Sequence, residues 1–297
     1  MHPVTIKPIL KWAGSKRALA ETVRRAFDST PAGHCEPFVG AGAVYLHRLS
    51  VGELRPGPHV VLADLCAPLV AFYRGVQADP AGVGLALDRL HWGLGWRDQY
   101  NDRRDEYNGW AMAIGPDHVA FAESAARFLW LNRACFNGLY RVSSTGKFNT
   151  PAGSYATLSR PTAGQVHALS EALAGVQLVC GSYQHTLRME RDWGSQVYVD
   201  PPYFGMFDQY TPVSWEYDEQ VRLALACTDA RARGAHVVAS NSDHPKLRAL
   251  WAGLGFDVRD ASVYHSVGAK GDRRTRAKEV VMVGMPPRKK KNQTPAV

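Results

Sequence analysis

Short apolar runs alternate with segments of helical periodicity along most of this chain of 297 residues. Runs typical of buried strands occur at 60–64, 176–180, 197–200, 236–240, 262–267 and 279–284. Helices are predicted over 15–29, with Ser15 as the N-cap, through 69–76, over 217–233 and through 247–254. This order predicts an α/β fold, in which a mostly parallel, Rossmann-like sheet has helices on both faces and ends in an antiparallel hairpin.

The alternation stops between about Leu65 and Val176. The pattern is weak from 78 to 104, a helix opened by Pro116 runs to about Asn132, and a loop rich in Gly, Ser and Asn covers 135–159. We therefore expect an inserted, mainly helical unit at 67–175. The remaining segments, 1–66 and 176–286, then form one discontinuous domain, and 287–297 is expected to be a disordered basic tail.

The composition is that of a globular enzyme, with 45% hydrophobic and 21% charged residues. No apolar stretch approaches the length of a membrane span, and the N-terminal residues lack the apolar core of a secretory signal. The five cysteines are scattered and never form a Cys-x-x-Cys pair, which indicates reduced thiols and no metal site. These features predict a cytoplasmic protein without a membrane partner.

A net charge of +8 indicates a polyanionic partner, such as a nucleic acid. The run from Arg288 to Lys291 contributes to this charge, although a basic tail can equally be a solvated feature. The other basic residues gather near the N-terminus and around the last predicted connection: Lys7, Lys11, Lys16, Arg17, Arg24 and Arg25, and Lys270, Arg273, Arg274, Arg276 and Lys278.

The apolar run 196–199 ends in Asp200-Pro201-Pro202-Tyr203. This sequence puts a carboxylate, a rigid backbone carbonyl and an aromatic ring at the end of a strand. Together they can hold a planar amino-purine or amino-pyrimidine, and the chemistry they favour is methyl transfer to an exocyclic amino nitrogen. A Pro-Pro pair after a strand is also a common loop opener, because proline cannot continue a central ladder.

A glycine loop, from Glu36 to Gly42, lies where a first strand should turn into a helix. Glycines let the backbone approach a ligand closely, and a helix N-terminus favours polar or anionic groups. Asp64 ends the next strand, so its carboxylate is expected beside the loop, placed for the two hydroxyls of a ribose. A lone Gly-x-Gly can be only a tight turn, but together with Asp64 it favours adenosine binding. Tyr45 stands where a dinucleotide site has its third glycine.

Three segments in this order, 8–16, 36–42 and 200–203, resemble the Dam-type DNA adenine N6-methyltransferases. The likeness continues at 130–141, 146–151 and 240–243, whereas 82–117 shows none, which leaves the target sequence open. The resemblance implies a methyltransferase sheet with an inserted target-recognition domain, S-adenosylmethionine as methyl donor and no metal. It also implies double-stranded DNA as the partner and admits a restriction endonuclease that acts on the same sites. Nothing in the chain demands more than a monomer.

The resemblance assigns roles to single residues. The catalytic motif is matched by Asp200, Pro201, Pro202 and Tyr203. The cofactor-contacting positions are matched by Trp12, Lys16, Glu36, Phe38, Gly40, Gly42, Asp64 and Asp200. The DNA-contacting positions, including a basic residue that can read a guanine, are matched by Lys11, Phe136, Asn137, Leu139, Arg141, Asn149 and Pro151.

The residue types at these positions suit the chemistry. Tyr203 can stack on a flipped-out base, while the Asp200 carboxylate and the Pro201 carbonyl accept the two hydrogens of its amino group. These hydrogen bonds strengthen as positive charge develops on the nitrogen, so they favour the transition state. In an alternative role, Asp200 deprotonates the amino group. The guanidinium fork of Arg141 can engage two acceptors of a guanine at once.

Simpler interpretations exist for several residues. Trp12 and Phe38 are candidates for cation–π contact with a sulfonium, but they can also be ordinary core residues. Lys16 can be a solvated helix residue. Asn137 and Asn149 can be turn formers. The loop aromatics Phe204, Phe207 and Tyr210 can close over the base or instead pin their loop to the core. The arginines at 273, 274 and 276 are expected to touch phosphates.

Three other functions remain open at this stage. The first is the same reaction on N4 of cytosine or on adenine in RNA, because these amines share their geometry. The second is a DNA-binding protein without turnover, which the intact Asp200–Tyr203 motif disfavours. The third is a nicotinamide enzyme, which Tyr45 in place of the third glycine disfavours.

Overall fold

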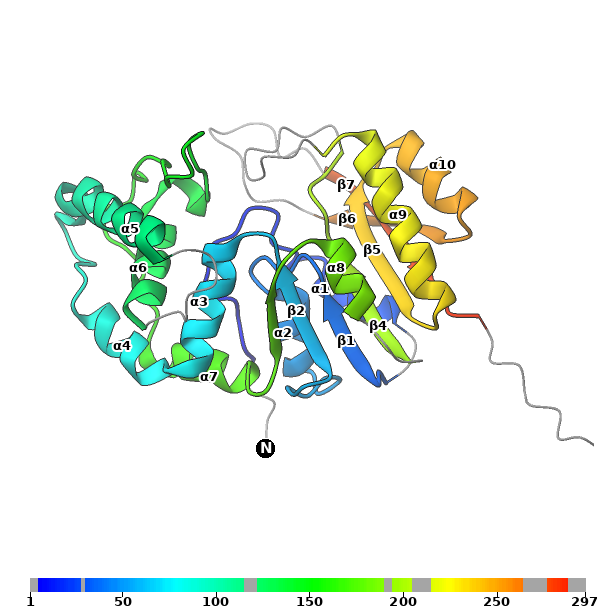
Figure 1. Ribbon diagram of the computed structural model, residues 1–297, viewed down its shortest axis with the longest axis horizontal. Helices are drawn as coiled ribbons and strands as arrows, with labels where there is room; N and C mark the ends of the chain where they lie inside the picture. The colour runs from blue at the N-terminus through cyan, green and yellow to red at the C-terminus, as the bar shows by residue number, and fades with distance from the viewer. Residues whose placement is uncertain are drawn as a thin grey trace, which may run out of the picture.

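The computed structural model describes residues 5–27, 30–114, 122–189, 194–204, 215–263 and 277–287. Within these ranges, seven strands form one sheet in the order β3-β2-β1-β4-β5-β7-β6 (Figure 1). The strands are β1 Gly33–Glu36, β2 Val60–Asp64, β3 Gln177–Cys180, β4 Ser195–Val199, β5 His236–Ser242, β6 Asp257–Val263 and β7 Ala277–Gly284. The first five are parallel, and β7 runs antiparallel between β5 and β6.

The strand order reverses between β1 and β4. The first strand, β1, lies in the middle of the sheet. The chain continues outward to β2 and β3 and then returns to β4 on the other side of β1. In open parallel sheets, ligands bind at the carboxyl ends of the strands at such a switch point. The two segments that follow β1 and β4 are therefore the places where a site is expected.

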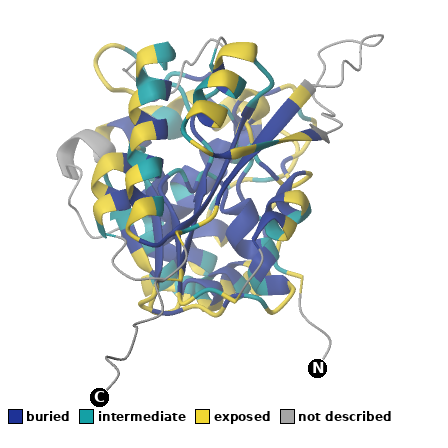
Figure 2. Cartoon of the chain, turned by 90° about the vertical axis from the view of Figure 1, so that its right-hand side faces the viewer, coloured by how far each residue is buried: buried dark blue, intermediate teal, exposed yellow. Residues whose placement is uncertain are grey.

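The strands in the middle of the sheet are buried (Figure 2). Helices cover both faces, and the side chains of the central strands alternate between two apolar clusters. Val197, Val199 and Val237 pack under three helices on one face, which are α8 Tyr183–Met189, α9 Tyr217–Ala232 and α10 Pro245–Gly253. Tyr198 and Val238 face the opposite side, against α1 Ala20–Ala26 and α2 Ala43–Ser50. This two-sided burial explains the continuous apolar runs in the sequence.

The remaining helices gather beside the β2 and β3 end of the sheet (Figure 1). They are α3 Ala67–Ala78, α4 Pro80–Asp88, α5 Tyr100–Ile114, α6 Ala122–Ala134 and α7 Ala163–Ala172, with short 3₁₀ turns η1 Trp96–Gln99 and η2 Phe136–Gly138. One apolar cluster joins them to the sheet, and the rings of Phe72 in α3 and Phe128 in α6 lie 5.8 Å apart. Among the helices described, none has the length and apolar content to cross a bilayer.

The sequence predicted the α/β class, the covered faces and the terminal hairpin correctly. Its first helix was wrong, because α1 begins at Ala20 and has Leu19, not Ser15, as its N-cap. Residues 13–19 form turns instead, since the segment is held by contacts to distant parts of the chain. Lys11, for example, bonds with Asn132 through its backbone, and Lys16 pairs with Asp200.

Two further predictions differ from the structure. The strand expected from 262 begins at Asp257, because charged side chains on this edge strand hide its apolar alternation. Helices α4, α5, α7 and α8 were not predicted, since their apolar residues form no clear stripe. The expected helix start at Pro116, residues 264–267 of the expected strand and the basic tail from Arg288 lie outside the described residues.

Candidate active site

The catalytic corner predicted from the sequence lies at the switch point. Asp200 directly follows β4, and the glycine loop directly follows β1, the strand paired with β4 through Cys35 and Val197. The Nζ atom of Lys16 lies 3.0 Å from Oδ1 of Asp200, and the Ser240 hydroxyl at the end of β5 donates to the same oxygen at 2.9 Å. Three separate segments therefore converge on one carboxylate.

The surroundings of Asp200 shift the pKa of its carboxyl group toward neutral pH. Burial raises the pKa of this carboxyl from 3.8 to about 6, and the nearby Glu279 carboxylate acts in the same direction. Lys16 and Ser240 oppose the rise by stabilising the anion. Asp200 is thus an anion above about pH 6, and it holds its charge against a desolvation penalty.

The catalytic corner, residues 200–203, is fixed by two side-chain amides beneath it. The side-chain amide of Gln220 in α9 donates to the Pro202 carbonyl at 3.0 Å, and Asn241 in β5 donates to Gln220 at 3.1 Å. Lys16 Nζ lies 4.5 Å from the centroid of the Tyr203 ring. Burial raises the pKa of the Tyr203 phenol, and the Asp200 and Glu279 carboxylates raise it further. Tyr203 therefore stays a neutral ring beside the Asp200 anion.

The glycine loop is fixed by Asp64 and by one tyrosine. Oδ2 of Asp64 accepts the Gly40 N–H at 3.1 Å, and Oδ1 accepts the Cys66 N–H at 2.9 Å. Burial raises the pKa of Asp64, and these backbone donors oppose the rise. The Tyr73 hydroxyl donates to the Gly40 carbonyl at 2.7 Å. Gly40 has φ +48°, and Gly42, the N-cap of α2, has φ +67°, a region that favours glycine.

Two predicted aromatic residues flank this loop differently. A Cβ placed on Gly40 would lie 3.0 Å from Cδ1 of Trp12, so only a glycine leaves this indole its position. Phe38 packs on the rings of Tyr183 and Trp215, at 5.6 Å and 5.5 Å. Asp64, the glycine turn and the half-buried indole of Trp12 therefore lie next to one another at the carboxyl end of the sheet.

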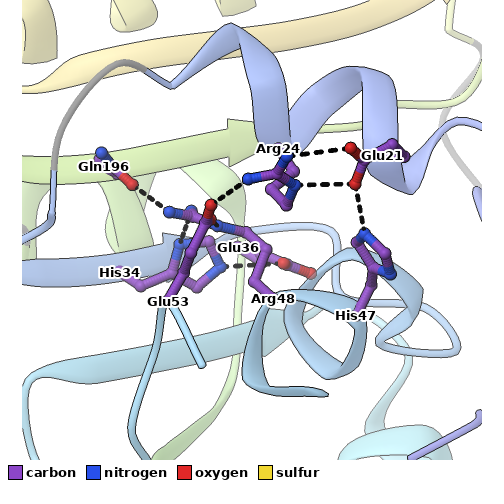
Figure 3. A network of polar contacts seen from close by, with 8 residues as sticks. All are labelled: Glu21, Arg24, His34, Glu36, His47, Arg48, Glu53 and Gln196. Carbon is purple, nitrogen blue, oxygen red and sulfur yellow. Dashed lines mark hydrogen bonds and ion pairs between the residues drawn. The ribbon is translucent and has the colours of Figure 1, made fainter. Parts of the chain in front are cut away.

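Glu36 faces the interior beneath the loop (Figure 3). Its carboxylate contacts Nε2 of His34 at 2.9 Å, and it is only 1% exposed. Burial raises the pKa of Glu36 to about 8, against the opposing charge of Arg48. Burial lowers the pKa of His34. The Glu36 side chain therefore supports the loop from within the core.

Arg48, fully buried in α2, lies at the centre of this network (Figure 3). It donates to Gln196 in β4 and to Glu53, and its Nη1 lies 3.3 Å from Nδ1 of His34. Figure 3 shows that Glu53 also binds Arg24 of α1. The network thus ties β1, β4, α1 and α2 together directly under the switch point.

The predicted DNA-contacting residues lie together on the segment after α6, next to Lys11. Lys11 Nζ lies 4.0 Å from the centroid of the Tyr155 ring. Phe136 is 45% exposed, and the exposed Asn137 has φ +53°, which supports its interpretation as a turn former. The side chains of Leu139 and Arg141 are half-buried, and Pro151 is exposed.

Arg141 and Asn149 are bound to each other. Nε of Arg141 donates to Oδ1 of Asn149 at 2.7 Å, and Nη2 donates to the Asn149 carbonyl at 3.0 Å. Asn149 therefore orients the guanidinium. Of the loop aromatics, Phe204 packs on Tyr217 and His244. Phe207, Tyr210, Arg273, Arg274 and Arg276 lie outside the described residues.

Some residues of the site carried no clear signal in the sequence. Ser240 lies in the family likeness at 240–243 without an assigned role there, and its place beside Asp200 could have been found from strand order, because β5 neighbours β4 and their ends coincide. Tyr73 and Gln220 look like ordinary helix residues, and only tertiary packing brings their polar atoms to the loop and the corner. The five cysteines all lie in the described ranges, and none is part of a disulfide. No group of three or more His, Cys, Asp or Glu residues in the described ranges could hold a metal ion.

The switch-point site and the sheet with its antiparallel β7 define a Rossmann-like methyltransferase. Residues 12–265 match the model of the D12 class N6 adenine-specific DNA methyltransferases, and the chain belongs to this family. It is therefore an adenine-specific DNA methyltransferase, and the family uses S-adenosylmethionine as methyl donor. The other functions left open by the sequence are not favoured.

Several curated proteins are similar to this chain. The DNA adenine methylase of Vibrio cholerae is 30% identical over 94% of this chain and 96% of its own length. The type II methyltransferase M1.LlaDCHI of Lactococcus lactis is 28% identical over 95% of this chain and 96% of its own length. The DNA N-6-adenine-methyltransferase of Escherichia phage P1 is 32% identical over 93% of this chain, which spans only 35% of the phage protein.

Proposed function

We propose that the chain methylates an adenine flipped out of double-stranded DNA, and that Asp200, Pro201 and Tyr203 hold the flipped base. The observation that carries this proposal is the Asp200 carboxylate, kept anionic by Lys16 and Ser240 beside the Tyr203 ring. Lys16 already places a cationic nitrogen against this acid and this ring. A base amine that gains positive charge during the reaction would find the same favourable surroundings.

The mechanism follows from the weak nucleophilicity of the N6 amine, whose lone pair is delocalised into the ring. Hydrogen bonds from its two hydrogens to the Asp200 carboxylate and the Pro201 carbonyl pull the nitrogen toward tetrahedral geometry. Tyr203 stacks on the base and fixes its plane. After the new C–N bond begins to form, the nitrogen becomes acidic, and Asp200 is the acceptor placed to take the released proton. Pro202 keeps the corner rigid through its bond from Gln220.

S-adenosylmethionine, when bound, supplies the methyl group as a sulfonium. Around its position, Asp64 would accept the ribose hydroxyls, and the turn at Gly40 and Gly42 would let the backbone approach. Trp12 and Phe38 would offer ring faces, with Phe38 anchored by Tyr183. Lys16 contributes by holding Asp200, and Glu36 by supporting the loop from the core. We infer that no metal takes part.

The recognition of DNA is assigned to the unit from 67 to 175 together with Lys11, while 1–66 and 176–286 form the catalytic domain. Arg141, oriented by Asn149, is proposed to read a guanine in the major groove. Phe136, Asn137, Leu139 and Pro151 lie on the same segment and would contact the DNA beside it. The excess positive charge of the chain supports a polyanionic partner.

Further assignments follow from this function. An enzyme that methylates cellular DNA works where that DNA is, so we place it in the cytoplasm. A monomer suffices, because every residue of the proposed site belongs to one chain. A modification enzyme of this kind would protect DNA from a restriction endonuclease that cuts the same sites, and we propose such an endonuclease as its partner.

The test is methyl transfer to DNA from a labelled donor, followed by digestion to nucleosides and mass analysis. The wild-type protein should form N6-methyl-2′-deoxyadenosine, and Asp200→Ala should not. Asp243→Ala is the matched control, since this acid follows β5 but pairs with Arg248 at 2.6 Å outside the corner. Label on cytosine would show that the acceptor is not adenine. Undiminished methyl transfer by Asp200→Ala would contradict the proposed role of this acid.

A further inference from the structure

The segment around Lys11 and Trp12 lies between the proposed recognition unit, residues 67–175, and the glycine loop, residues 36–42. The Asn132 side chain, buried in α6, accepts the Lys11 N–H at 2.8 Å and donates to the Lys11 carbonyl at 2.6 Å. Both backbone groups of Lys11 are thus held by one amide. Gly138 approaches the same residue so closely that a Cβ there would lie 2.4 Å from the Lys11 Cβ. The next residue, Trp12, is therefore fixed relative to the recognition segment.

The indole of Trp12 lies between the two sites. On one side it contacts Gly40 of the cofactor loop, where a Cβ would come within 3.0 Å of the ring. On the other side it stacks on Tyr140, with ring centroids 6.3 Å apart and an interplanar angle of 18°. Tyr140 in turn packs on Phe148 at 5.5 Å and on Phe128 at 5.9 Å. A column of rings therefore leads from the recognition loop to the glycine loop.

Tyr140 is the chain neighbour of two proposed DNA contacts. Leu139 precedes it and Arg141 follows it, so a DNA contact that orders either one also constrains the backbone of Tyr140. A small cavity, of about 10 Å³, is lined by Tyr140 together with Asn132 and Phe148. The space is about that of one water molecule. The ring of Tyr140 thus borders a small gap in an otherwise packed cluster.

We propose that Tyr140 is a positioning residue for Trp12, and that through this contact DNA recognition and cofactor affinity are coupled. The proposal rests on the proposed DNA contacts of Leu139 and Arg141. DNA that orders the recognition loop fixes Tyr140, which presses Trp12 onto the Gly40 turn and completes one wall of the cofactor site. Because linkage is reciprocal, bound cofactor must tighten DNA binding by the same factor.

The experiment measures the Kd of S-adenosylhomocysteine, the unreactive demethylated product, by titration calorimetry with and without DNA. The DNA is a short duplex that carries the word found methylated in cells expressing the protein. For the wild type, the duplex should lower the Kd about 5-fold or more. Tyr140→Phe keeps the ring and should retain this factor, whereas Tyr140→Leu should reduce it to within about twofold of unity.

The matched control is Phe256→Leu, which removes a buried aromatic ring that packs on Trp251 and contacts neither Tyr140 nor Trp12. This variant should keep the wild-type factor. If Tyr140→Leu does not fold, Tyr140→Met replaces it, since it fills space without a ring. An unchanged factor in the Tyr140 variant, equal losses in both positions, or no coupling in the wild type would each overturn the inference. Failure of the wild-type protein to form N6-methyl-2′-deoxyadenosine in DNA would instead contradict the proposed function.

Discussion

The Nζ atom of Lys16 lies 3.0 Å from Oδ1 of Asp200, although the two residues are far apart in the sequence. Lys16 precedes the first helix, and Asp200 follows the fourth strand. Their contact closes the switch point between the glycine loop and the catalytic corner. It also places a positive charge beside the acid on which the proposed reaction depends.

The pKa of Asp200 makes activity dependent on pH. Its folded-state pKa of about 6 lies above the ordinary value of 3.8, so the acceptor anion is lost as the pH falls through about 6. We expect kcat/KM to decline about tenfold per pH unit below this value. Lys16 lowers the pKa of Asp200, so Lys16→Met should move the acid limb of the profile to higher pH.

The same shift has a defined effect on folding. Between about pH 4 and 6 the folded chain binds this proton more tightly than the unfolded chain. The contribution of Asp200 to the free energy of unfolding therefore falls as the pH rises through this window.

For the kcat/KM profile, an acid limb that stays in place after Lys16→Met would show that Asp200 is not the group whose ionisation limits the rate.

Substitution of Gly40 should weaken the cofactor site. Gly40→Ala forces a side chain into φ +48° and brings a Cβ to 3.0 Å from Trp12. We expect S-adenosylhomocysteine to bind about tenfold more weakly, equivalent to about 1.4 kcal/mol. Gly146→Ala is the control, because this residue has φ +79° but open space around it. Equal affinity losses at both positions, measured by calorimetry, would assign the effect to backbone strain alone.

Arg48 should matter for stability more than any surface ion pair. Arg48→Met removes the buried hub that joins Gln196, Glu53 and His34, which should cost about 3 kcal/mol and lower the Tm by several degrees. Arg89→Met, which breaks an exposed pair with Glu123, should leave the Tm nearly unchanged. Thermal unfolding followed by circular dichroism compares the two, and similar shifts would mean that the network under the loop is not a stabilising unit.

Much of the fold could be predicted because strands buried on both faces are continuous apolar runs. Asp64 and Asp200 end two such runs, and parallel strands bring their ends to one edge, so the meeting of these two carboxylates could be expected from the sequence. The helices beside β3 lack this regularity. In α5, for example, charged residues such as Arg103 and Glu106 pair with each other and hide the few buried rings.

Contacts across long sequence distances could not be predicted. Nothing local in 11–16 indicates that Lys11 bonds with Asn132 or that the helix expected from Ser15 begins only at Ala20. Similarly, nothing local indicates that the Glu36 side chain is buried and contacts His34, which in turn lies beside Arg48. Polar side chains choose among partners that only the folded chain supplies.

The single-turnover rate of methyl transfer by Asp200→Asn tests the proposed grip on the adenine amine most directly. Asparagine keeps the shape of the side chain but removes the anion that stabilises developing positive charge. With enzyme saturated by donor and DNA, the rate should fall by about 10² to 10³, while the Kd of S-adenosylhomocysteine changes by less than about threefold. A rate within tenfold of the wild type would contradict the role of Asp200.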